Sequence, residues 1–189
     1  MASETTEELD DDGLVIQKYD SLVLVVLPPE GFGDQILRYA RSSLYNIHVG
    51  TWSVSTVTEE MIKGRLQDEF MVDGPLAGCK MDDYSGILLA GSDGSNPLAA
   101  DAAVLQLVRE AHAAGKLIAG WGNALDVMVK AGVVKGAKVT GSEDLAASTK
   151  SAGGKFTGRQ IQVSGHIITA ADESAGMRFG QALAEEVRI

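Results

Sequence analysis

The sequence predicts one α/β domain, a three-layer α/β/α sandwich around a mostly parallel sheet. Three short apolar runs, at residues 21–27, 86–90 and 116–119, have the length and the Val, Leu and Ile content of strands buried on both faces. Each run ends in a turn that contains glycine, and each turn leads into a segment with apolar residues at helical spacing. Strands that alternate with helices in this way form βαβ units, whose strands run parallel.

The first half of the chain supplies the first of these units. The run SLVLVVL at 21–27 stops at two prolines, and a glycine-rich loop follows it. Apolar spacing then predicts a helix over 34–44, and period-two alternation predicts a strand within 47–57. A short extra strand is expected at 70–72.

The second half repeats the pattern and ends in a hairpin and a helix. One helix is expected over 98–114, with Pro97 in its first turn. The next is expected over 124–131, capped by Asn123 and closed by Gly132. Further strands are expected at 137–140, 160–163 and 166–169. The last two are joined by a hairpin turn at 164–165, and a closing helix is expected at 174–187.

Charge divides the chain into an acidic tail at residues 1–18 and a single domain at residues 19–189. Residues 1–12 hold six carboxylates and no Lys or Arg. Because the tail also has too few apolar groups to offset the entropy lost on ordering, we expect it to be disordered. Residues 1–12 carry six of the ten net negative charges. The rest of the chain is slightly acidic, without the basic stripe that nucleic-acid binding requires.

The composition excludes several further classes. No apolar run is long enough to cross a bilayer, and the N-terminus lacks the basic residues of a secretion signal. We therefore expect a cytoplasmic protein that binds neither membranes nor nucleic acid. The single cysteine, Cys79, excludes an internal disulfide and any metal site built from several cysteines.

The position of a ligand site follows from the predicted fold. In open α/β sheets, ligands bind beyond the carboxyl ends of the parallel strands. Three loops follow those ends, at residues 28–34, 91–96 and 120–123. We expect any site to be built from these loops. Exposed N–H groups at the start of the helix at 124 are suited to an anion or another small ligand.

Three stretches in this order resemble a known family: DDYSGILLAG at 82–91, KLIAGWGNALDVMVKAGVVKGAKVTG at 116–141 and VSGHIITA at 163–170. The series is similar to the DJ-1/PfpI (ThiJ) superfamily, grouped with the class I glutamine amidotransferase-like proteins, and the resemblance covers about residues 20–187. It implies a flavodoxin-like α/β sandwich and a homodimer. The members include glyoxalase- and deglycase-like enzymes, amidases, isonitrile hydratases and stress proteins.

The reactive residues that this resemblance implies are absent at the aligned positions. In the family, a cysteine on a strained turn after a central strand becomes a nucleophile with the help of a helix N-terminus and a nearby glutamate. The cysteine position is Gly122, and the next position, histidine in many members, is Asn123. The glutamate position is Gly33. The family's Pro-Gly-Gly turn, which offers backbone N–H groups to an oxyanion, is Ala90–Gly91–Ser92.

We therefore favour a catalytically degenerate family member, a pseudoenzyme homodimer that binds a small molecule or has a structural or stress-related role. The alternative is a hydrolase- or lyase-type enzyme (glyoxalase-, amidase- or isonitrile-hydratase-like) that works without cysteine, with Asp34 or Asp93 as general base. The candidate pocket residues are Gly33, Asp34, Gly91, Ser92, Asp93, Trp121, Gly122 and Asn123.

The remaining reactive side chains are expected to be structural, with no metal and no cofactor. The three histidines, His48, His112 and His166, lack the short spacing of a metal site. Cys79 precedes the second central strand, away from the three loops. For Trp121 two interpretations stay open: it fills or covers the vacated pocket, or it lies in the core.

Overall fold

The computed structural model describes residues 8–9, 15–16, 18–92 and 96–187. Within these residues a seven-stranded sheet has the order β12-β13-β9-β8-β3-β4-β7, and only the β12–β13 pair is antiparallel. These strands span Ile161–Ser164, Ile167–Ala170, Leu117–Trp121, Gly86–Leu89, Ser21–Leu27, Val49–Ser55 and Gly74–Pro75. The predicted fold class, a flavodoxin-like α/β/α sandwich, is confirmed.

The strand β3 shows why the apolar runs form central strands. Val23, Val25 and Leu27 pack in the core on one face, and Leu24 and Val26 pack in the core on the other. Because side chains alternate along a strand, a continuous apolar run is buried on both faces only between two layers of helices.

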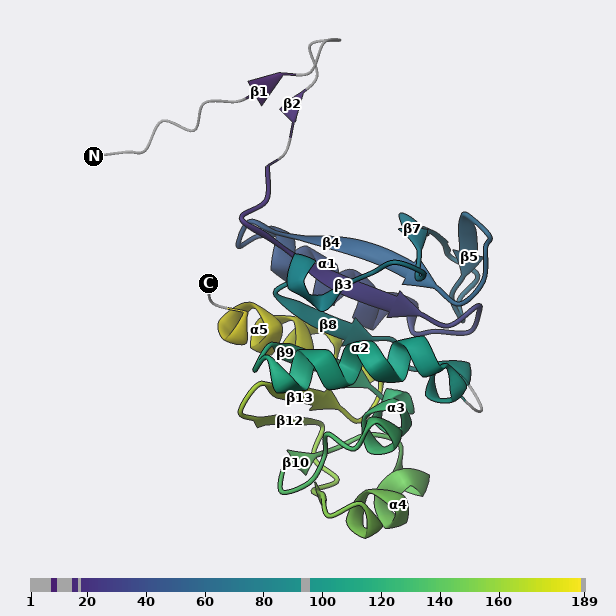
Figure 1. Ribbon diagram of the computed structural model, residues 1–189, viewed down its shortest axis with the longest axis vertical. Helices are drawn as coiled ribbons and strands as arrows, with labels where there is room; N and C mark the ends of the chain where they lie inside the picture. The colour runs from purple at the N-terminus through teal and green to yellow at the C-terminus, as the bar shows by residue number, and fades with distance from the viewer. Residues whose placement is uncertain (1–7, 10–14, 17, 93–95, 188–189) are drawn as a thin grey trace, which may run out of the picture.

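The two helical layers cover opposite faces of the sheet. Helices α1 (Asp34–Tyr45) and α5 (Gly176–Glu186) contribute Leu37 and Leu183 to one core cluster. Helices α2 (Ala102–Ala113) and α3 (Ala124–Ala131) contribute Val108 and Met128 to the other. Figure 1 shows α2 in front of the sheet and α1 behind it. Among the described residues, no helix is both long and apolar enough to span a membrane.

The helix expected over 98–114 begins later than predicted. The structure has a 3₁₀ turn at Pro97–Ala100, extended backbone at Asp101 and then α2. The Asp101 carboxylate accepts the backbone N–H groups of Ala103 and Val104 at 2.9 and 3.0 Å. Asp101 is therefore the N-cap of α2. It separates the 3₁₀ turn from α2, although the apolar spacing predicts a single helix across both.

Two of the strands expected from the sequence belong to short sheets outside the central one. The strand expected at 137–140 is β10 (Lys138–Val139), which pairs in parallel with β11 (Lys155–Phe156). The strand expected at 70–72 is β6 (Glu69–Met71), and it forms a hairpin with β5 (Met61–Lys63), which was not predicted.

Three shorter segments complete the comparison with the sequence. Helix α4 (Ala146–Ser151) was not predicted. The hairpin turn between β12 and β13 consists of Gly165 and His166, one residue later than expected, because Ser164 pairs with Ile167. Most of the tail expected to be disordered lies outside the described residues, and its two described segments, β1 (Glu8–Leu9) and β2 (Val15–Ile16), pair antiparallel.

Candidate functional site

The three loops that follow β3, β8 and β9 meet at the carboxyl edge of the sheet. The Gly33 N–H donates to the Gly91 carbonyl at 3.2 Å, and Phe32 forms an isolated bridge with Ser92. The Ser92 N–H donates to Oδ1 of Asn123 at 2.8 Å. The loops that the sequence places at this edge are therefore joined by direct hydrogen bonds.

Gly122 occupies a sharp turn between β9 and α3. Its φ is +57°, in the left-handed region that only glycine enters without steric cost. Its N–H donates to the Ala170 carbonyl at 3.0 Å, and its carbonyl accepts the Ser142 N–H at 3.1 Å. A Cβ added here would meet no atom closer than Ser142 Oγ at 3.6 Å. The turn thus keeps its shape through backbone contacts and leaves open space where a side chain would stand.

Asn123 lies beside this turn and links two of the loops. Its Oδ1 also accepts Nδ2 of Asn96 at 3.3 Å, and the residue is only 8% exposed. The Ser92 N–H is the position that the resemblance assigns to oxyanion binding. Because this N–H already donates to Asn123, it is used within the protein.

A cavity of about 390 Å³ opens over the Gly122 turn. It is lined by residues of six segments of the chain, many of them glycine, hydroxyl-bearing or charged: Gly31, Arg65, Gly91, Ser92, Trp121, Gly122, Asn123, Ser142, Ala171, Asp172, Glu173 and Ser174. Five of the expected pocket residues are among them: Gly91, Ser92, Trp121, Gly122 and Asn123. Gly33 and Asp34 are not, and Asp93 lies outside the described residues.

Asp34 is fully buried at the start of α1, and it does not line the cavity. Its Oδ2 accepts the Leu66 N–H at 2.8 Å, so the carboxylate holds the turn between β5 and β6. Gly64 lies against it so closely that an added Cβ would come within 2.1 Å of Oδ1. This contact explains why the polar residue beside Gly33 is structural, contrary to its expected place in the pocket.

Glu173 supplies a carboxylate that the sequence analysis missed. A Cβ added to Gly33 would lie 2.7 Å from the Glu173 Cγ and 2.8 Å from its Oε1, so this side chain fills the space beside Gly33. Its Oε2 pairs with Arg65 at 2.8 Å. Glu173 follows β13, which runs parallel to β9 and ends at the same edge of the sheet. Its position after a predicted strand is the sequence feature that could have placed it at the site.

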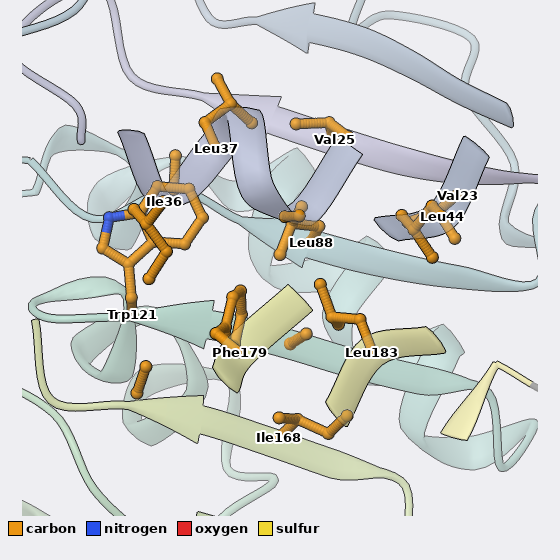
Figure 2. Packing of buried hydrophobic residues seen from close by; sticks show 14 of the residues in the cluster. Val23, Val25, Ile36, Leu37, Leu44, Leu88, Trp121, Ile168, Phe179 and Leu183 are labelled. Carbon is orange, nitrogen blue, oxygen red and sulfur yellow. The ribbon is translucent and has the colours of Figure 1, made fainter. Parts of the chain in front are cut away.

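Two buried polar atoms of the lining have no partner in the part of the chain that the structure describes: Ser92 Oγ and Trp121 Nε1. Trp121 is 2% exposed and packs edge-on against Phe179, with ring centroids 5.9 Å apart. Figure 2 shows the indole nitrogen directed away from Phe179. Trp121 therefore lies in the core, as one of the two interpretations expects, and it also lines the cavity. Buried Trp N–H groups ordinarily have a partner.

Cys79 lies outside the cavity, between β7 and β8. Its Sγ is 3.5 Å from the Pro75 carbonyl oxygen, and the Tyr84 hydroxyl donates to it at 3.9 Å. Burial, followed by the neighbouring Cys79, raises the pKa of Tyr84 to about 12. Cys79 is thus placed as expected, away from the strand-end loops.

The histidines form one pair and no larger cluster. His112 Nδ1 and His166 Nε2 are 2.9 Å apart, and burial together with His112 lowers the pKa of His166. His48 is exposed at the end of the loop before β4. Among the described residues no group of three His, Cys, Asp or Glu side chains could hold a metal ion.

The family model of the DJ-1/PfpI family matches residues 22–186. The chain belongs to the DJ-1/PfpI family. It is 27% identical over 161 residues to an uncharacterized protein of Methanocaldococcus jannaschii, a match that covers 84% of this chain and 78% of that protein.

Solved structures of similar proteins share the fold. The ThiJ/PfpI domain protein from Brachyspira murdochii superposes with a TM-score of 0.82 at 19% identity, covering 90% of this chain and 97% of that one. Drosophila melanogaster DJ-1beta superposes with a TM-score of 0.79 at 23% identity, and the match covers 88% of this chain and 90% of that one. This DJ-1/PfpI protein therefore has the family's architecture across nearly its whole length.

Proposed function

We propose that this DJ-1/PfpI protein binds a small polar molecule in the strand-end cavity and does not perform thiol-dependent catalysis. The observation that carries the proposal is Gly122. It stands on the turn to which the alignment assigns the cysteine, keeps a left-handed φ of +57° and presents no nucleophile to the cavity. Covalent catalysis of the family's kind needs a thiolate at this point.

The oxyanion position supports the same conclusion. Donors that stabilise an oxyanion must be aimed at the developing charge and free to bind it. The Ser92 N–H donates to Asn123 at 2.8 Å, and Asn123 is also held by Asn96. A tetrahedral intermediate would have to displace this contact.

The cavity lining favours a small, neutral ligand that carries hydroxyl or carbonyl oxygens. Trp121 and Ser92 line the cavity, and their Nε1 and Oγ atoms are buried without partners among the described residues. A ligand that reaches them would accept from Nε1 and would donate to Oγ or accept from it. Arg65, the cation of the described lining, is already paired with Glu173. A volume of about 390 Å³ is at the small end of the usual range for ligand sites.

Titration of dihydroxyacetone, followed by calorimetry or ligand-detected NMR, tests the proposal. Trp121→Phe keeps an aromatic side chain, smaller than the indole, and removes the N–H, so it should weaken binding about two- to tenfold, as should Ser92→Ala. Trp52→Phe, remote from the cavity, is the matched control. No binding, or equal binding by the variants, would contradict the proposal, and preferential binding of acetate would indicate an anion site.

An enzyme that works without cysteine is the second candidate, and Glu173 is the observation that favours it. This carboxylate lines the cavity and occupies the space beside Gly33. As a general base it would act on a ligand proton within hydrogen-bond reach. Turnover of methylglyoxal, an amide or an isonitrile that Glu173→Gln abolishes would establish this candidate; turnover that survives it would reject Glu173 as the base.

Homodimer formation, a stress-related role and a cytoplasmic location remain proposals that rest on family habit and composition. Sedimentation velocity tests the dimer, and suppression of the aggregation of a heat-denatured client at sub-stoichiometric ratio tests the stress role.

A further inference from the structure

A second and larger cleft lies at the β4 edge of the sheet. Its volume is about 830 Å³, and it lies between β4, β7, the β5–β6 hairpin and the start of α2. It shares no lining residue with the strand-end cavity. A site here is therefore independent of the function proposed above.

The cleft gathers large apolar side chains that are exposed. Trp52 is 38% exposed, Met61 47% and Met71 62%, and all three line the cleft. Single exposed apolar residues are ordinary, but several around one concave surface are typical of a binding site. Methionine adapts its shape to different ligands, and tryptophan offers a flat aromatic face.

The Trp52 ring packs against its neighbour on β7. A Cβ added to Gly74 would lie 3.0 Å from the Trp52 Cζ2 and 3.3 Å from its Nε1. The absence of a side chain at Gly74 therefore lets the indole lie close to the β7 backbone. A ring that already packs on backbone loses less entropy when a ligand stacks on it than a ring free in solvent does.

The charge of the lining is entirely negative. Among the residues that the structure describes, four carboxylates and no Lys, Arg or His line the cleft; the carboxylates belong to Glu59, Glu60, Asp73 and Asp101. None of the four takes part in an ion pair among the described residues. Asp73 accepts the Ser53 N–H at 2.6 Å, and Asp101 caps α2. These contacts orient both carboxylates, but neutral N–H donors do not cancel their charge.

We infer that this cleft binds an amphipathic organic cation, an aromatic or alkyl body that carries an ammonium group. The apolar body packs against Trp52, Met61 and Met71. The ammonium group is attracted by the quadrupole of the Trp52 ring and by the uncompensated Glu59 and Glu60 carboxylates. Anions are repelled by the same lining.

A second copy of this chain is a poorer occupant. A twofold contact centred on the cleft would bring each acidic lining, with its Glu59 and Glu60, toward the same surface of the partner. Like charges that face each other across an interface oppose association. The observations therefore favour a cation over self-association at this surface.

Calorimetric titration with benzyltrimethylammonium tests the inference. We expect a dissociation constant of about 1 mM or tighter, at least about fivefold weaker binding of benzyl alcohol, and no binding of benzoate. Trp52→Leu should weaken binding of the cation at least about fivefold. Binding should also weaken as NaCl is raised from about 0.05 to 0.5 M, because the exposed carboxylates are screened.

A pair of charge variants separates a local effect from a global one. Glu59→Gln with Glu60→Gln should weaken binding, whereas Glu185→Gln with Glu186→Gln, exposed on α5, removes the same charge elsewhere and should not. Equal effects of the two pairs, binding of benzyl alcohol as tight as that of the cation, or no binding by a folded protein would overturn the inference. So would a dimer that Met61→Lys with Met71→Lys dissociates.

Discussion

The central sheet and the loops at its carboxyl edge are stabilised in different ways. The sheet is buried on both faces between layers of helices, and its fold matches solved structures at 17–23% identity. The loops are joined to one another by hydrogen bonds, and their residues line the cavity. At Gly122 the turn is held by hydrogen bonds to Ala170 and Ser142 that involve no side chain of its own.

This comparison indicates that the shape of the site and its chemistry depend on separate interactions. Backbone hydrogen bonds and sheet packing position the loops, so the side chains of the site can change without loss of the fold. Glu173 fills the space beside Gly33. The following variants should show that the sheet sets stability while the loops set binding.

The largest expected effect is in the core. Phe179→Ala removes a fully buried ring that packs against Trp121, so the free energy of unfolding should fall by about 3–5 kcal/mol. Denaturant titration measures the change. Phe156→Ala, at a half-buried ring outside the central sheet, is the control and should cost less. Equal losses would remove the distinction between the sheet and its periphery.

The next effect is at the contact between two loops. A Cβ at Gly91 would lie 2.2 Å from the Trp121 carbonyl oxygen, and backbone cannot move away cheaply. Gly91→Ala should therefore cost about 1–3 kcal/mol and abolish binding in the strand-end cavity. Thermal melting and the dihydroxyacetone titration together report both effects. Unchanged binding would show that the loops adapt, and that their spacing is not fixed by the sheet.

A smaller cost is expected for restoring a thiol. Gly122→Cys meets no steric obstacle within 3.6 Å, but a φ of +57° costs an L-residue about 1–2 kcal/mol. Gly132→Cys, at φ +81° with open space around it, is the matched control and should lose a similar amount. A Gly122→Cys protein that melts at the same or a higher temperature would contradict the view that glycine relieves strain here.

The smallest effect concerns pH. Burial and His112 lower the pKa of His166 in the folded state, so the unfolded chain binds this proton more tightly. The contribution of His166 to stability is present above about pH 6.5 and is lost as the pH falls through its lowered value. His166→Gln should make the melting temperature less dependent on pH below 6.5, and an unchanged dependence would assign the effect to other groups.

The sequence predicts the sheet well because burial imposes its pattern directly. The alternation of Val23 to Leu27 places side chains in both cores, and the three loops do meet at one edge. Asp101 was missed because the apolar spacing continues through it, and only the capping of Ala103 and Val104 reveals the break. The spacing of apolar residues carries no information about this capping contact.

The site was less predictable because its contacts join distant segments. Asp34 and Glu173 are both carboxylates near Gly33, yet the first is buried against the β5–β6 turn and the second lines the cavity. No sequence spacing distinguishes them. The cleft around Trp52 is likewise assembled from segments that meet only in the folded chain.

The absence of thiol-dependent catalysis can be tested directly with carbon-13-labelled methylglyoxal. NMR follows the labelled compound in the presence of the protein or of its Cys79→Ala variant. We predict that neither protein converts it to lactate, because the cavity presents no thiolate. Lactate formation by the unmodified protein would contradict the account. If Cys79→Ala abolished it, the alignment of the nucleophile would be wrong; if the activity survived, catalysis without a thiol would be established.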